Sequence, residues 1–160
     1  MTKFSIFVSQ IIDTFRSALF RESDLFLIGA RDLWNNNFCI GYPAVSVNDR
    51  GDYGYTIAGG GRAGGGGTAV KGYVGFIDEY TISGNMMYLT ASGTHNPSNG
   101  RFGDYFTIHR QTPCGLFFVA TNYALSGGTG IANVNSHYVE FGRGRDYVCW
   151  NGWSQRNRAP

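Results

Sequence analysis

Five polar or aromatic residues that could bind a ligand lie close together between positions 95 and 105. They are His95, Asn96, Arg101, Asp104 and Tyr105. An arginine can hold a carboxylate or sulfate through two parallel hydrogen bonds, an aspartate can accept sugar hydroxyls or act as a general acid, and a tyrosine ring can stack on a sugar. Because loops on a rigid scaffold often carry function, we interpret these five residues as candidate ligand-binding residues.

Three of these residues also have a structural explanation. In a Gly-Asp-Tyr turn, Asp104 caps backbone amides, Tyr105 enters the core, and Arg101 pairs with the aspartate three residues on. The structural role is favoured for Asp104 and Tyr105, whereas the two roles of Arg101 are evenly balanced. Arg31 and Asp32 form a weaker candidate site, and a local ion pair would explain them equally well.

No group of residues in the sequence matches a catalytic or metal-binding pattern. Glycoside hydrolysis needs two carboxyl groups about 5–10 Å apart, and the adjacent Asp78 and Glu79 would face opposite sides of a strand. The 3 histidines lie in no nucleophile motif. The 3 cysteines lack Cys-x-x-Cys spacing, so we predict no metal and no cofactor. We expect small buried cysteines, with one disulfide and a free thiol as the alternative.

The charge balance argues against a nucleic acid partner. The chain has 13 lysines and arginines against 11 acids, a net charge of +2, which is small for binding an anionic polymer or membrane. The tail from 147 to 160 and the residues just before it are more basic and aromatic. The residues concerned are Arg143, Arg145, Tyr147, Trp150, Trp153, Arg156 and Arg158. Such a stretch could stack bases, but we expect a solvated terminus.

The composition predicts an all-β chain from residue 24 to residue 146. The 24 glycines and the 16% aromatic content favour short strands joined by tight turns. We expect strands over 25–28, 44–47, 53–57, 73–77, 80–82, 86–90, 105–108, 116–121 and 138–141. Turn residues at 48–51 predict a hairpin over 44–57. The glycine-rich stretch 59–67 lacks the Gly-Lys-Ser/Thr ending of a phosphate-binding loop, so we expect a flexible connection.

Residues 1–23 differ from the rest of the chain. Their apolar residues recur at steps of three and four, which predicts an amphipathic helix laid against one open side of the sheet. A membrane-surface or partner helix is one alternative, and a strand beginning at 5–8 is another. The apolar run is too short to span a membrane, and it makes a poor signal peptide because polar residues interrupt it.

Two parts of the chain resemble each other at an offset of about 60 residues, somewhat longer than the roughly 40–50 residues of a propeller blade. The extra residues can lie in the glycine-rich loop and in the loop over 92–103. The segment Val45–Val47, its turn and Gly59-Gly60 correspond to Phe106–Ile108, a turn at Gly115 and Gly127-Gly128.

Three short motifs carry a likeness to a known family. They are Tyr-Pro-Ala-Val-Ser-Val-Asn at 42–48, Arg-Phe-Gly-Asp-Tyr at 101–105 and Phe-Val-Ala-Thr-Asn-Tyr at 118–123. In these motifs the chain resembles the C-terminal blades of sialidase-like β-propeller domains of exported bacterial proteins, mostly of unassigned function. The repeated Asp-containing turns, the arginine triad and the catalytic acids of true sialidases are not matched.

The resemblance implies an all-β fold, a partial β-propeller of about two antiparallel four-stranded blades, preceded by the short N-terminal helical or irregular segment. The expected division is 1–23, 24–146 and the tail 147–160. Since propellers close with four or more blades, we expect a fragment of a longer protein, or self-association that covers open edges.

The function implied by the resemblance is a non-catalytic scaffold or binding surface for a glycan or another protein. The location implied is extracellular or periplasmic. The alternative is one part of a sialidase-like glycoside hydrolase whose remaining catalytic residues lie outside this chain. A self-assembling structural domain is a third possibility.

Overall fold

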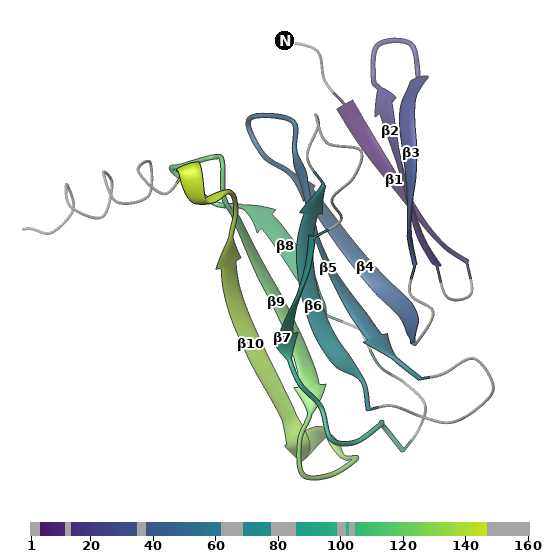
Figure 1. Ribbon diagram of the computed structural model, residues 1–160, viewed down its shortest axis with the longest axis vertical. Helices are drawn as coiled ribbons and strands as arrows, with labels where there is room; N and C mark the ends of the chain where they lie inside the picture. The colour runs from purple at the N-terminus through teal and green to yellow at the C-terminus, as the bar shows by residue number, and fades with distance from the viewer. Residues whose placement is uncertain are drawn as a thin grey trace, which may run out of the picture.

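The computed structural model describes residues 4–11, 14–34, 38–61, 69–77, 86–98, 102 and 105–146. In this part the chain forms three antiparallel sheets (Figure 1) and two short 3₁₀ helices, η1 (Ile131–Asn133) and η2 (Gly144–Asp146). The prediction of an all-β chain is therefore confirmed. None of the three sheets closes on itself. No helix among the described residues is long and apolar enough to cross a membrane.

The first sheet contains β1 (Phe4–Ile11), β2 (Thr14–Arg21) and β3 (Phe26–Trp34), paired in that order. The prediction of a helix over residues 1–23 is wrong, because two strands of a hairpin occupy this segment. Aromatic and β-branched residues favour the strand conformation. Strand β2 also pairs with β3, so its backbone is hydrogen-bonded on both edges.

The second sheet is a four-stranded meander of β4 (Cys39–Val47), β5 (Tyr53–Gly60), β6 (Lys71–Ile77) and β7 (Met86–Ala91). The predicted hairpin over 44–57 is confirmed, since Val47 pairs with Tyr53 and Ala44 pairs with Thr56. Gly59 and Gly60 of the predicted loop belong to β5. The remainder of that loop, 62–67, and the predicted strand 80–82 lie outside the described residues.

The third sheet contains β8 (Thr107–Arg110), β9 (Phe118–Leu125) and β10 (Val134–Phe141), with β9 in the middle. The sheets therefore number three in the described chain, and one of them has four strands. This corrects the prediction of about two four-stranded blades. Residues 1–23, which were expected to form a helix, contain β1 and β2, and these strands form a separate sheet with β3.

The three sheets are stacked in the order of the chain, with the second sheet in the middle (Figure 1). Strand β5 is buried on both faces as a result. Tyr55 and Ile57 belong to an apolar cluster with Leu33 of the first sheet. Gly54 lies on the opposite face, beside Phe118 of the third sheet.

A network of charged side chains joins the second and third sheets at one end of the stack. Asp52 follows the β4–β5 turn and is 1% exposed. Its carboxylate accepts hydrogen bonds from Arg50 and Arg143, and Arg50 also donates to Oδ1 of Asp146 over 2.6 Å. Arg143 is thus an ion-pair partner rather than part of a solvated basic terminus.

Replacing Gly54 by alanine is expected to push the second and third sheets apart. A Cβ at this position would lie 2.8 Å from Cγ of Phe118, and overpacking a core costs about 1–3 kcal/mol. Gly29→Ala is the matched control, because a Cβ at Gly29 meets nothing within 4 Å. Urea unfolding should show the loss for Gly54→Ala alone. Equal stability of the two variants would contradict this packing.

Replacing Asp52 by asparagine is expected to lower the free energy of unfolding by about 3 kcal/mol. The change leaves two arginines in a largely buried site without their shared counter-charge. Asp49→Asn is the control, because Asp49 pairs with Arg110 while both side chains are about half exposed, and such pairs contribute less than about 1 kcal/mol. A small effect of Asp52→Asn in urea unfolding would mean that the network does not join the sheets.

Burial of Tyr55 predicts a loss of stability in alkali. Burial raises the pKa of this phenol well above its ordinary value. Once the pH passes about 10, the unfolded chain loses the proton while the folded chain keeps it, so stability falls by up to about 1.4 kcal/mol per pH unit. Urea unfolding of Tyr55→Phe above and below pH 10 should show a shallower decline than the parent chain. An unchanged decline would show that Tyr55 ionises in the folded state.

Candidate functional site

The predicted binding loop lies between β7 and β8, and the structure describes part of it. His95 and Asn96 are exposed. Arg101 and Asp104 lie outside the described residues, so their predicted roles stay predictions. Tyr105 is 88% exposed and has a φ of 78°. The structural expectation that Tyr105 enters the core is therefore wrong, because its strained turn directs the ring to solvent.

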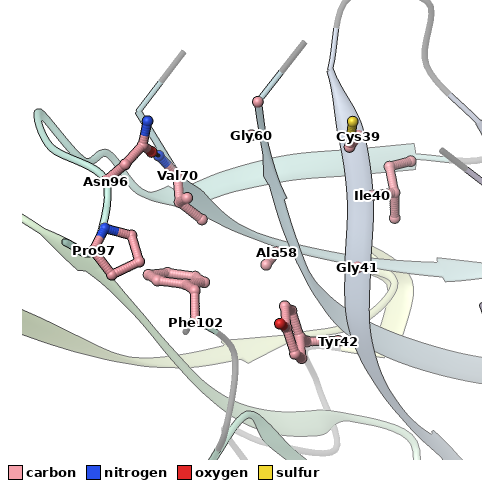
Figure 2. A pocket seen from close by; sticks show the side chains of 11 residues that line it. Cys39, Ile40, Gly41, Tyr42, Ala58, Gly60, Val70, Asn96, Pro97 and Phe102 are labelled. Carbon is pink, nitrogen blue, oxygen red and sulfur yellow. Dashed lines mark hydrogen bonds between the residues drawn. The ribbon is translucent and has the colours of Figure 1, made fainter. Parts of the chain in front are cut away.

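A pocket of about 350 Å³ lies beside this loop (Figure 2). It lies at the start of β4 and the end of β5, whereas the charged network lies at the turn that joins these two strands. Its floor consists of residues with small side chains on β4 and β5, together with Gly61. Cys39 pairs with Gly60 and Gly41 pairs with Ala58. Since paired residues of antiparallel strands share a face, these four residues form one shallow surface.

Tyr42 forms one side of the pocket. The register of β4 and β5 shifts between Gly41 and Ala44, and Tyr42 lies within this bulge with a φ of 53°. Bulges redirect side chains and are common beside functional sites. The ring of Tyr42 is 43% exposed and borders the cavity in Figure 2.

The opposite side of the pocket comes from the loop after β7 and from Val70. Asn96 accepts a hydrogen bond at Oδ1 from the backbone N–H of Val70, over 3.0 Å. The loop is also fixed to the end of β9, because the N–H of Thr94 donates to the carbonyl of Leu125 over 2.8 Å. Hydrogen bonds thus place Asn96 and the neighbouring Pro97 at the pocket.

Phe102 completes this side and is supported by two further rings. Its centroid lies 4.6 Å from that of Tyr123 and 6.0 Å from that of Phe106. The Phe106 and Tyr123 rings are 5.2 Å apart in an edge-to-face arrangement. Such contacts hold rings in defined orientations, so Phe102 is a firm support for anything bound in the pocket.

Asp32, one of the weaker candidate residues, does not line this pocket. Asp32 lies on β3 and accepts two hydrogen bonds from Arg16 of β2, over 2.6 and 2.7 Å. These hydrogen bonds hold the pKa of Asp32 below its ordinary value. Arg16 and Asp32 are register partners on neighbouring strands. The side chain of Arg31 lies outside what the structure describes, so its expected ion pair stays a prediction.

The cysteines differ from one another in state. Cys114 is disulfide-bonded. The expectation of a small buried thiol is therefore wrong for this residue, and the alternative of one disulfide applies to it. Cys39 retains its thiol, is partly buried and lines the pocket. No group of three or more His, Cys, Asp or Glu side chains suited to a metal occurs among the residues that the structure describes.

Sequence reasoning identified Asn96 as a candidate but missed Tyr42, Val70 and Phe102 as parts of a site. Tyr42 carried one usable signal. It follows a glycine and precedes a proline at the start of an otherwise regular strand, a pattern that favours an irregular backbone.

Comparison of the chain with protein-family models, curated proteins and solved structures found no match in any of the three.

Proposed function

We propose that this chain is a non-catalytic carbohydrate-binding part of a propeller-like assembly, and that its pocket holds a neutral sugar ring against Tyr42. The observation that carries the proposal is the pocket itself. It pairs an exposed tyrosine and a supported phenylalanine with a floor of small side chains. A sugar ring can approach such a floor closely while its apolar C–H face covers an aromatic side chain.

The polarity of the pocket supports a neutral sugar as the ligand. None of the lining residues that the structure describes carries a charged side chain. The Nδ2 group of Asn96 and the hydroxyl of Tyr42 are suited to sugar hydroxyls, since few well-placed polar groups suffice to orient a ligand in an apolar pocket.

The side chains of the described lining support binding of a sugar without its hydrolysis. A glycoside hydrolase needs an acid and a second carboxyl group about 5–10 Å apart. The described lining residues include no aspartate and no glutamate. The alternative of a glycoside hydrolase therefore requires carboxyl groups from elsewhere.

The order of the sheets supports a propeller-like assembly. Successive sheets are meanders, and β4 packs against β8 as β5 packs against β9. These strand pairs match the two copies of the sequence repeat. Consecutive blades of a propeller stack in this way. Further blades, or a second copy of the chain, would cover the open outer strands.

The disulfide supports an oxidising location. Disulfides persist in extracellular and periplasmic proteins and are rare in reducing compartments. The bond at Cys114 is therefore consistent with export. Alkylation without reductant, followed by peptide mapping, should label Cys39 but not Cys114.

Tyr42→Ala is expected to weaken sugar binding without unfolding the chain. A screen of the purified protein on neutral mono- and oligosaccharides would identify a ligand, and titration calorimetry would compare the variants. Removing one stacking ring should weaken binding about tenfold or more, since aromatic contacts and buried ring area contribute about 1–3 kcal/mol. Tyr42→Phe should keep most of the affinity.

Tyr138→Ala is the matched control, because Tyr138 is an exposed tyrosine on β10 that does not line the pocket. The thiol of Cys39 gives a second measurement, since a bound sugar should slow its alkylation. Equal losses of affinity in Tyr42→Ala and Tyr138→Ala, or unchanged alkylation of Cys39 at saturating sugar, would count against the proposed site.

A further inference from the structure

Three residues from other parts of the chain approach the backbone of Val70, which lines the pocket (Figure 2). The N–H of Val70 donates to Oδ1 of Asn96 over 3.0 Å. A Cβ at Gly93 would collide with the carbonyl oxygen of Val70, and a Cβ at Gly60 would lie 2.9 Å from its Cα. Both polar groups of the Val70 backbone are therefore in contact with the loop after β7, and Gly60 packs closely against the same residue.

The loop after β7 is also fixed to the third sheet. The N–H of Thr94 donates to the carbonyl of Leu125 over 2.8 Å, and the hydroxyl of Thr94 accepts a hydrogen bond from the N–H of Gly127 over 3.0 Å. A Cβ at Gly93 would lie 3.2 Å from the carbonyl oxygen of Leu125. Gly93 thus occupies a narrow space between Val70 of the pocket and Leu125 of β9, and this space has no room for a side chain.

Hydrogen bonds and close backbone contacts, rather than apolar packing, hold this loop in place. Ser92, Thr94, His95 and Asn96 are all exposed. Segments with few buried apolar contacts open locally at a lower free energy than the core does. A loss of contact at Gly93 or Asn96 is therefore expected to open this side of the pocket without unfolding the sheets.

We infer that Gly93 and Asn96 are positioning residues of the pocket, which act on ligand binding by holding Val70 and the loop after β7 in place. Gly93 does not line the cavity, so its effect on a ligand must pass through its neighbours. Binding costs less when a site is ordered before the ligand arrives. The inference rests on the proposed function for the identity of the ligand, whereas the positioning of Val70 can be measured without a ligand.

The test uses the thiol of Cys39, which is partly buried and lines the same pocket. Alkylation of such a thiol by iodoacetamide follows the fraction of locally opened molecules, so Gly93→Ala should raise its rate about fivefold in the absence of sugar. Titration calorimetry with glucose and N-acetylglucosamine should show an affinity about tenfold lower for Gly93→Ala than for the parent chain, because the added methyl group overpacks this side of the pocket.

Two glycine variants separate this local effect from a general loss of stability. Gly54→Ala lies at the other end of β5 and is overpacked against Phe118. It should lower the urea midpoint while leaving the alkylation of Cys39 and the sugar affinity near the values of the parent chain. Gly29→Ala, where a Cβ meets nothing within 4 Å, should change none of the three measurements.

A pair of substitutions at Asn96 tests the same inference independently, and it keeps the test valid if Gly93→Ala does not fold. Asn96→Ala removes the oxygen that accepts the hydrogen bond from Val70, so it should raise the alkylation rate of Cys39 as Gly93→Ala does. Asn96→Asp keeps an accepting oxygen at this position and should restore the rate of the parent chain.

The outcomes distinguish the positioning role from the proposed sugar binding. If Gly93→Ala and Asn96→Ala are alkylated at the rate of the parent chain, the positioning role is wrong. It is also wrong if Gly54→Ala raises the rate equally, because a general loss of stability then explains the effect. If the rates change as expected but neither sugar binds to the parent chain, the positioning role stands and the proposed function fails for these sugars.

Discussion

Strand β5 has no solvent-facing side, and the arrangement of the molecule follows from that constraint. Its odd-numbered residues face the first sheet with large side chains such as Tyr55 and Ile57. Its even-numbered residues face the third sheet, where Gly54 and Ala58 leave room for the incoming layer. The polar side chain of Thr56 on this strand is fully buried and donates its hydroxyl to the carbonyl of Tyr73.

The two ends of the stack differ in how the second and third sheets meet. At one end, Asp52, Arg50, Arg143 and Asp146 join the turns of the second and third sheets through ionic hydrogen bonds. At the other end, the pocket lies between β4, β5 and the loop after β7, and its described lining carries no charged side chain. Because the ionic network holds the second and third sheets together at one end, the pocket at the other end can remain open without a shift of one sheet against the other.

Much of the architecture could be predicted from local sequence. The turn at 48–51 and the alternating residues beside it gave the central hairpin, because Val47 and Tyr53 needed no distant partner to define their register. The N-terminal strands could not be predicted in the same way. Their apolar spacing is compatible with a helix, and pairing with β3, which lies later in the chain, decides between the two conformations. The pocket was harder still, since Tyr42, Val70 and Asn96 meet only after three separate segments are assembled. Asn96 was found because it lies in a polar loop, whereas Tyr42 was noted only as the first residue of the motif at 42–48.

The floor of the pocket also limits which substitutions the site can accept. Gly60 is fixed, because a Cβ there would lie 2.9 Å from the Cα of Val70. Cys39 and Ala58 already carry side chains that face the cavity, so exchanging one small residue for another at these positions would alter its depth and polarity while the hydrogen bonds of the strands stay intact. Related chains could therefore acquire new ligand preferences through one or two substitutions on an unchanged scaffold.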